Sequence, residues 1–204
     1  EPLIPGVSHI PYGDADAVED ALAAGDISAV VLEPIQGEGG VIVPPDDYLT
    51  RVRELTHAAR ALLILDEVQT GIGRTGDWFA FQRSGIQPDA ITIAKGLGGG
   101  IPVGALVTFG PEVSGLLQPG MHGSTFGGNP LASAAGLAVL STIERDGLLR
   151  HTSEVGDGFA AAVLALGHPQ IREVRGRGLL RGIALSSPIA PAVMGIARAD
   201  GFIV

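Results

Sequence analysis

The sequence predicts an α/β fold: a largely parallel sheet with helices, followed by part of a smaller α+β C-terminal domain. Two short apolar runs, residues 62–65 and 90–94, are continuous rather than alternating, which is typical of strands buried on both faces of a parallel sheet. A helical pattern at residues 48–59 precedes the first run, and such a crossover helix joins parallel strands. The 204 residues, 46% of them hydrophobic, suffice for one domain and part of a second. We expect the division at 1–150 and 151–204.

The first part of the chain contains a loop, two helices and one further strand. Residues 14–24 carry apolar side chains at helical spacing, and Asp14 or Asp16 provides an N-cap. Residues 28–35 form an apolar run that we expect to be a buried strand, and a glycine-rich turn follows it. Two prolines and two aspartates then precede the helix at 48–59, as is common at a helix start.

The later part of the chain shows strand and helix signals with clear boundaries. Asn129 followed by Pro130 predicts an N-cap and first helical position, and the Ala-rich helix after them should be well buried. Pro102 at the start of a strand favours an edge or antiparallel position. The expected elements are a strand at 102–109, helices at 131–143 and 144–166, strands at 171–174 and 179–185, and a helix at 188–199.

The glycines at residues 71–76 formally match the G-x-G-x-x-G pattern of dinucleotide-binding proteins. That fingerprint has to open a helix that packs on the sheet, whereas Asp77 and Trp78 follow here and Gly85 and Pro88 soon interrupt the run. We therefore interpret the segment as a loop in which glycine permits close packing. A nucleotide-dependent oxidoreductase remains the alternative enzyme that uses this segment.

The charge and cysteine content narrow the classes of function. A net charge of −9 argues against a nucleic-acid partner, because phosphate binding requires a basic surface. The sequence contains no cysteine, which fits a cytoplasmic protein. We see no signal peptide, and no apolar run reaches the roughly 18 residues of a membrane span, so we expect no membrane partner.

Two chemically active side chains follow the two apolar runs. Asp66 ends the first run and Lys95 ends the second, and ligands of open α/β sheets bind outside the carboxyl ends of the strands. A neutral lysine attacks carbonyl groups, and pyridoxal phosphate (PLP) offers an aldehyde together with a ring nitrogen that a carboxylate keeps protonated. Taken alone, the two residues also allow a helix-capping Asp and a solvated Lys.

Four segments in this order resemble the fold-type I, class III PLP-dependent aminotransferases: DEVQTG at 66–71, GRTG at 73–76, PD at 88–89 and AKGLGGGIP at 94–102. Within that class the sequence is most similar to members that act on N-acetylornithine. The resemblance implies that Lys95 binds PLP covalently, Asp66 pairs with the ring nitrogen, Val68 packs on the ring and Gln69 reaches the ring hydroxyl. Glu67 lies in the same cofactor-facing stretch, and no metal is implied.

Two further segments resemble the substrate side of that family. EPIQGEGG at 33–40 resembles a loop whose second Glu, here Glu38, pairs with an arginine and releases it when a dicarboxylate arrives. HGSTFGGNP at 122–130 resembles a segment whose Thr, here Thr125, reaches the cofactor phosphate of the neighbouring subunit, with Ser124 beside the substrate. The resemblance therefore implies a homodimer with a shared active site.

The activity implied by the resemblance is amino transfer from N-acetylornithine to 2-oxoglutarate in arginine biosynthesis. Ornithine, succinylornithine or 4-aminobutyrate remains possible as the donor, and a non-catalytic module of the same fold is a further alternative. The chain opens at Glu1 without Met and closes on an apolar run. We expect an internal piece of a longer enzyme, in which the phosphate loop, the ring-stacking aromatic residue and the substrate arginine lie outside these residues.

Overall fold

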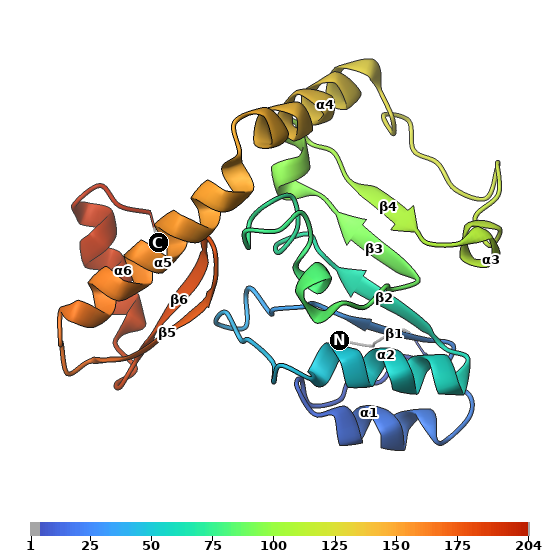
Figure 1. Cartoon of the computed structure of the whole chain (residues 1–204), viewed down its shortest axis with the longest axis horizontal. Coiled ribbons are helices and arrows are strands. Elements are labelled where there is room, and N and C mark those ends of the chain that lie inside the picture. Colours follow the sequence, from blue (N-terminus) through green and yellow to red (C-terminus); the bar gives the residue numbers. More distant parts are fainter. Residues whose placement is uncertain (1–4, 204) are drawn as a thin grey trace.

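The computed structural model of the chain describes residues 5–203. A four-stranded sheet runs in the order β1-β2-β3-β4, formed by Ala29–Leu32, Leu62–Asp66, Ala90–Ile93 and Ala105–Thr108 (Figure 1). The first three strands are parallel and β4 is antiparallel to β3. The expected parallel sheet, and the antiparallel edge strand after Pro102, are thus confirmed.

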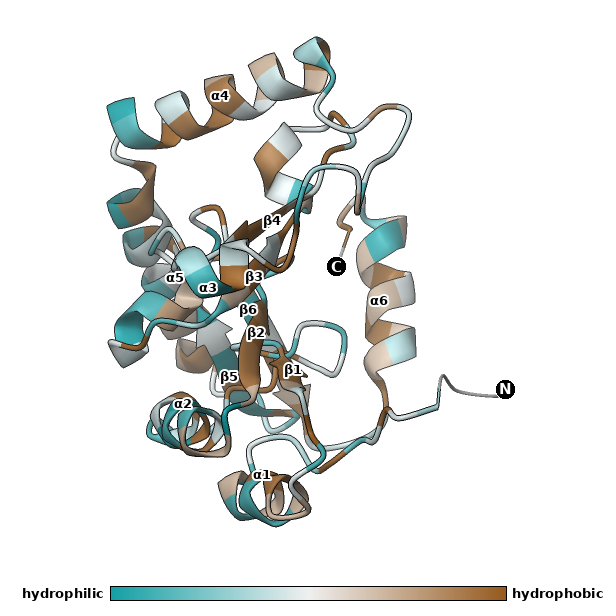
Figure 2. Ribbon diagram, turned by 90° about the vertical axis from the view of Figure 1, so that its right-hand side faces the viewer, coloured by the Kyte–Doolittle hydropathy of each residue, from teal (hydrophilic) through white to brown (hydrophobic). Residues whose placement is uncertain are grey.

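Helices α1 (Ala15–Leu22) and α2 (Tyr48–Ala59) lie together against one side of the sheet (Figure 1). Asp14 caps α1 by accepting a hydrogen bond from the amide of Ala17 at 3.0 Å, as expected. The core between these helices and the sheet includes Val18, Val52, Leu63 and Ile91, each at most 1% exposed. The strands are among the most hydrophobic parts of the ribbon in Figure 2.

The first strand differs from its expectation in length and burial. It spans four residues instead of eight, and Val31 in it is 65% exposed. The reason is its place at the edge of the sheet, with only β2 as a neighbour. Strands β2 and β3 have neighbours on both sides, and they carry the fully buried side chains Leu63, Leu65 and Ile91.

The long helical region after the sheet divides into two helices, and the break lies at residues 146–147 instead of after residue 143. After the short helix α3 (Pro111–Ser114), α4 (Pro130–Arg145) begins at the expected Asn129 cap and ends at Asp146. Gly147, with φ +62°, precedes α5 (Leu148–Ala165), and the chain bends between the two helices (Figure 1). The sequence signal was present in Asp146-Gly147, because glycine readily adopts this left-handed conformation.

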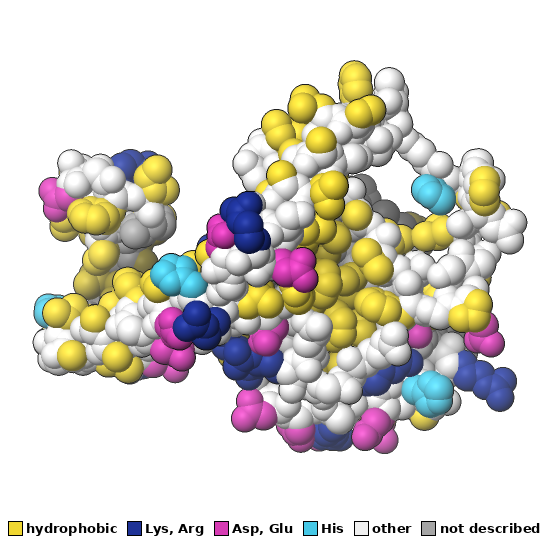
Figure 3. Space-filling model, turned by 45° about the horizontal axis from the view of Figure 1, so that its top comes forward, with side chains coloured by type: hydrophobic (Ala, Val, Ile, Leu, Met, Phe, Trp, Pro, Cys, Tyr) yellow, Lys and Arg dark blue, Asp and Glu magenta, His cyan; other side chains and the backbone are white. Residues whose placement is uncertain are grey.

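The expected burial of α4 is wrong for this chain. Only Ala132 and Gly136 are buried in it, whereas Leu131 and Leu137 are 70% and 66% exposed. In α5, Phe159 is 48% exposed. Figure 3 shows the hydrophobic side chains of this region on the surface of the molecule. Apolar residues at helical spacing predict a face that needs a partner, and few residues of this chain cover it.

In the C-terminal part of the chain, a β-hairpin lies between α5 and α6 in the sequence. Strands β5 (Ile171–Arg177) and β6 (Leu180–Leu185) pair antiparallel, and α6 spans Ala190–Ala199. The hairpin contacts α5, and its turn lies against the glycine loop at 71–76: the amide of Leu179 donates to the carbonyl of Arg74 at 2.9 Å.

Close packing explains the glycines that mimic a dinucleotide fingerprint: a Cβ on Gly71 would lie 2.8 Å from the Glu67 oxygen, and one on Gly76 would overlap the Ser153 hydroxyl. The hairpin turn packs as closely on the same loop. A Cβ on Gly178 would lie 2.7 Å from the Arg74 oxygen, so the two backbones approach too closely for a side chain. Residues 71–76 form turns, and the next helix is the 3-10 helix η1 (Ala80–Ser84), so the interpretation as a loop is confirmed. Among the described residues, no helix is both long and apolar enough to span a membrane.

Candidate active site

The carboxyl ends of β2 and β3 bring the two expected reactive side chains to one edge of the sheet. Asp66 is the last residue of β2, and Lys95 begins the 3-10 helix η2 (Lys95–Gly98) directly after β3. The two strands are neighbours, with Asp66 opposite Thr92. Lys95 is exposed and Asp66 is half-buried. The amine and the carboxylate therefore both lie at the edge of the sheet where the carboxyl ends of β2 and β3 meet.

Asp66 is oriented by two donors that both bind its Oδ1 atom. The amide of Val68 and the hydroxyl of Thr92 each donate at 3.0 Å. Within residues 5–203 these are its hydrogen bonds, so Oδ2 keeps its capacity to accept a proton or hydrogen bond from a ligand. The sequence reasoning missed Thr92, although a single hydroxyl in the apolar run AITIA was a usable signal.

Backbone strain concentrates in the loops around this edge. Four residues other than glycine have positive φ in the described chain, and three of them lie in these loops: Lys95 (+40°), Ile72 (+54°) and Val41 (+52°). The fourth, Arg60, caps the end of α2. Such conformations cost free energy and persist where the surrounding structure holds them, as it does at many ligand sites.

Helix α4 supports the turn that carries Lys95. A Cβ on Gly99 would lie 2.8 Å from Val139 Cγ2, and one on Gly136 would lie 3.5 Å from the Leu97 oxygen. These close approaches seat α4 directly on η2. The position of Lys95 thus depends on a helix that starts 35 residues later, at Pro130.

Glu38 and Gln69 meet although they follow different strands. Gln69 Nε2 donates to Glu38 Oε1 at 3.0 Å, across 31 positions in the sequence. Gly37 makes the contact possible, because a Cβ there would lie 2.5 Å from Gln69 Nε2. Glu38, expected on the substrate side, and Gln69, expected on the cofactor side, are therefore joined by a direct hydrogen bond.

Glu67, the residue after Asp66, is buried. Its side chain is 1% exposed, and its carboxylate accepts hydrogen bonds from the Thr70 hydroxyl and from the amides of Ala80 (3.1 Å) and Phe81 (3.0 Å). Burial raises the pKa of Glu67, although these three hydrogen bonds act to lower that pKa. The Glu67 carboxylate thus holds the start of η1 in this chain, and its expected place in the cofactor-facing stretch stays a prediction.

The structure leaves Ser124 and Thr125 apart from this edge. Both are exposed in the loop between α3 and α4, and Figure 1 shows that loop beyond β4, while the edge with Asp66 lies at the end of β2. The hydrogen bonds of the loop are local, such as the one from the Asn129 side chain to the Phe126 carbonyl at 2.9 Å. Within residues 5–203, no element brings them to Lys95.

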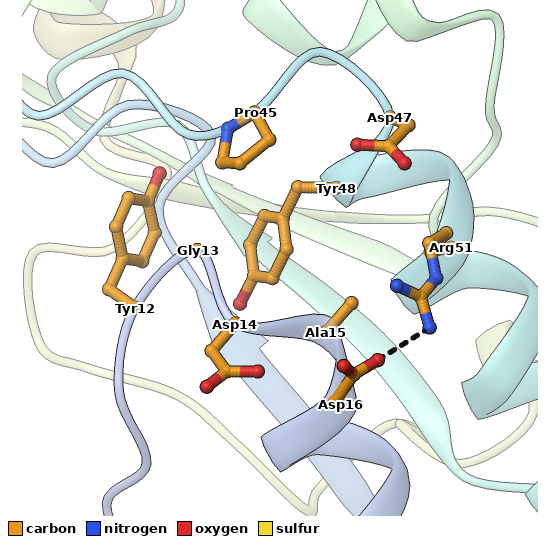
Figure 4. A pocket seen from close by; sticks show the side chains of 9 residues that line it. All are labelled: Tyr12, Gly13, Asp14, Ala15, Asp16, Pro45, Asp47, Tyr48 and Arg51. Atoms are coloured by element: carbon orange, nitrogen blue, oxygen red, sulfur yellow. Dashed lines mark hydrogen bonds and ion pairs between the residues drawn. The ribbon is translucent and has the colours of Figure 1, made fainter.

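A separate recess of about 400 Å³ lies between the starts of α1 and α2 (Figure 4). The rings of Tyr12 and Tyr48 pack edge to face in it, 5.6 Å apart, and Arg51 pairs with Asp16 at 2.8 Å. Burial raises the pKa of Tyr12, whose hydroxyl donates to the Glu33 carbonyl. None of the expected site residues lines this recess.

Comparison with known proteins identifies the family that this chain resembles. The Aminotransferase class-III family description matches residues 2–204. An acetylornithine aminotransferase of Streptomyces coelicolor is 52% identical over 208 residues, covering 100% of this chain and 51% of that protein. One of Mycobacterium tuberculosis is 54% identical over 204 residues, covering 100% and 50%. This chain thus spans about half the length of the curated relatives it matches.

Solved structures agree with the fold. The ornithine aminotransferase of Toxoplasma gondii superposes with a TM-score of 0.92 at 38% identity, covering 100% of this chain and 49% of that one. An acetylornithine aminotransferase from Elizabethkingia anophelis gives a TM-score of 0.89 at 38% identity, covering 98% and 52%. These similarities confirm the α/β fold class expected from the sequence.

Proposed function

This chain belongs to the class III aminotransferase family, and we propose that it is the central part of an enzyme that transfers amino groups with PLP. We propose N-acetylornithine as donor and 2-oxoglutarate as acceptor, in arginine biosynthesis. The observation that carries the proposal is the placement of Asp66 and Lys95 at the ends of adjacent parallel strands. The names of the relatives, at 52% and 54% identity, support this donor over ornithine, succinylornithine or 4-aminobutyrate.

The residues present fit PLP. The Asp66 carboxylate has a free Oδ2, and Lys95 presents an amine on a turn whose next residues, Gly96 and Gly98–Gly100, have no side-chain bulk. When bound, PLP supplies a protonated ring that withdraws electrons from the carbon bearing the amino group. Asp66 would hold the proton on the ring nitrogen, because a nearby carboxylate favours the charged form.

Lys95 would act twice, as the covalent anchor and as the proton carrier. Once the substrate amine has displaced it, Nζ would take the proton from the substrate carbon that bears the amino group and, as general acid, deliver it to the cofactor carbon. Val68 would pack on the ring. The Gln69 amide, already 3.0 Å from Glu38, would reach the ring hydroxyl.

On the substrate side, we propose that Glu38 pairs with an arginine outside this chain and that Ser124 contacts substrate. Thr125 would reach the cofactor phosphate of the other subunit of a homodimer. The exposed loop that carries Thr125, and the exposed Leu131 and Leu137 next to it, support a second subunit here.

We also propose a cytoplasmic location, in keeping with the absence of cysteine. The domain division stays a prediction. It is supported by the break at Gly147, after which α5 packs on the β5–β6 hairpin.

Borohydride trapping of the complete enzyme, followed by peptide mass mapping, tests the proposal. A pyridoxyl adduct on the peptide with Lys95 is expected, and the Lys95→Ala variant should show none. No adduct on a folded protein with excess PLP would contradict the proposed chemistry. A screen of the four donors then tests the substrate, and the expected result is the highest kcat/KM with N-acetylornithine.

A further inference from the structure

The loop that carries Glu38 contains a strained residue, Val41. Its φ of +52° is one that β-branched residues rarely adopt. The amides of Gly40 and Val41 both donate to the Gly37 carbonyl at 3.1 Å, so the loop is a closed turn. A strained conformation needs contacts that hold it, and those contacts come from another part of the chain.

The contacts come from two glycines of the β5–β6 hairpin. A Cβ on Gly176 would lie 2.8 Å from Val41 Cγ1, and one on Gly182 would lie 3.0 Å from Val41 Cβ and Cγ2. In the hairpin register Gly182 is opposite Arg175 and Gly176 is opposite Arg181, so the two glycines lie one position apart on the paired strands. The side chain of Val41 therefore packs against two positions that lack a Cβ. At Gly182 the Val41 side chain is the nearest neighbour of an added Cβ, whereas at Gly176 an added Cβ would first overlap the Leu180 carbonyl oxygen.

The other end of the same loop is held by Gln69. Gly37 packs against the Gln69 amide, which binds Glu38 at 3.0 Å. At the two ends of the loop, Gln36 and Ile42 exchange two backbone hydrogen bonds of 3.0 Å. Little freedom remains in the segment, so a displacement of Val41 has to move Glu38.

We propose that Val41, seated between Gly176 and Gly182, is a positioning residue for Glu38, and that the β5–β6 hairpin thereby sets the affinity for substrate. The inference rests on the proposed role of Glu38 on the substrate side. It assigns a function to hairpin glycines that lie far along the chain from every expected site residue. Cofactor binding at Asp66 and Lys95 should be independent of this contact.

The variant Gly182→Ala of the complete enzyme tests the contact. Gly182 does not have a positive φ, so the added methyl acts through crowding: it would lie 3.0 Å from Val41 Cβ and Cγ2, and only then 3.4 Å from the Gly40 oxygen. We expect KM for 2-oxoglutarate to rise roughly five- to tenfold, with kcat and the absorbance of bound PLP nearly unchanged. The matched control is Gly158→Ala, where a Cβ meets nothing within 4 Å. A KM in Gly182→Ala equal to that of the control would overturn the proposal.

A second variant keeps the test valid if Gly182→Ala fails to fold. Val41→Gly removes the side chain and relieves the strain, and the same rise in KM is expected. In the double variant Val41→Gly with Gly182→Ala, the methyl group at position 182 has no Val41 side chain to displace. The KM of the double variant should therefore equal that of Val41→Gly alone. Additive effects of the two substitutions would contradict a direct contact.

Hydrogen exchange separates this inference from the proposed activity. In Gly182→Ala the amides of Gly40, Val41 and Ile42 should exchange at least about tenfold faster than in the wild type, whether or not turnover is found. Unchanged exchange rejects the contact. Faster exchange in a protein without aminotransferase activity retains the contact and rejects the proposed function, and with it the assigned role of Glu38.

Discussion

Two neighbouring acidic residues at the end of β2 have different surroundings and therefore different roles. Asp66 is half-buried at the sheet edge, with its Oδ1 held by Val68 and Thr92. Glu67 is 1% exposed and holds the first amides of η1. Successive side chains of an extended chain point to opposite sides, so adjacent residues of one motif need not face one ligand.

Thr92→Val should weaken the orientation of Asp66 without changing the volume of the side chain. One hydrogen bond to a charged group contributes about 1.5 kcal/mol, so a roughly tenfold loss in kcat/KM is expected. The absorbance of bound PLP should also change its pH dependence, because the ring nitrogen would lose part of its partner. Thr92→Ser keeps the hydroxyl and should restore both quantities; a Ser variant as impaired as Val would contradict the role of this hydrogen bond.

Glu67→Gln should change how stability depends on pH. Burial raises the pKa of Glu67 in the folded state above the value of 4.5 for the unfolded chain. The folded protein thus binds the carboxyl proton of Glu67 more tightly than the unfolded chain does. The contribution of Glu67 to the free energy of unfolding is therefore complete below pH 4.5 and is lost as pH rises through the folded pKa. In urea unfolding of the cofactor-free enzyme, the free energy of unfolding of wild type minus that of Glu67→Gln should fall between pH 4 and neutrality. A difference that grows with pH would mean that the hydrogen bonds outweigh burial.

At the scale of elements, the turns after the strands are held by other elements. Helix α4 seats η2 through Gly136 and Gly99, and the β5–β6 hairpin seats the loop at 36–42 through its two glycines. The starts of these elements are set locally, as at the Asn129 cap of α4, whose Oδ1 accepts from the amide of Ala132 at 3.0 Å.

Asn129→Ala should therefore destabilise α4 and the turn it supports. Loss of an N-cap costs about 1 kcal/mol of unfolding free energy. Asn129→Asp preserves the acceptor and should remain within a few tenths of a kcal/mol of the wild type. Urea unfolding of the complete enzyme measures both, and equal losses in the two variants would show that the cap is not the cause.

At the scale of the whole molecule, the chain carries some residues of the proposed active site and also exposes apolar side chains that a second subunit would cover. Leu131, Leu137 and Phe126 are at least 66% exposed, and Thr125 lies beside them. A shared site in a homodimer would cover these side chains and bring Thr125 to a cofactor.

Mixed dimers test this arrangement. Lys95→Ala and Thr125→Ala should each be weakly active at limiting PLP, but coexpression should restore about a quarter of wild-type activity. Half of the dimers are mixed, and each mixed dimer has one site with both residues intact. If Lys95 and Thr125 served the same subunit, no mixed dimer would have an intact site and coexpression would restore nothing.

The isolated chain of 204 residues should not turn over. The expected phosphate loop, ring-stacking aromatic residue and substrate arginine are not assigned to any of its residues. An assay with PLP, N-acetylornithine and 2-oxoglutarate checks this, with the complete enzyme as the positive control. Clear turnover by the isolated chain would show that these residues suffice.

The sequence by itself determined the sheet strands that lead to Asp66 and Lys95, the Asp14 and Asn129 caps, and the loop nature of residues 71–76. These features depend on apolar runs, caps and glycines within a few residues of one another. Only the tertiary structure decided that Glu67 is buried, that Thr92 orients Asp66, that Gln69 meets Glu38, and that two glycines hold Val41. Each of these depends on groups brought together from distant positions, 26 residues apart for Thr92 and Asp66 and 31 for Gln69 and Glu38, by packing that local patterns do not encode.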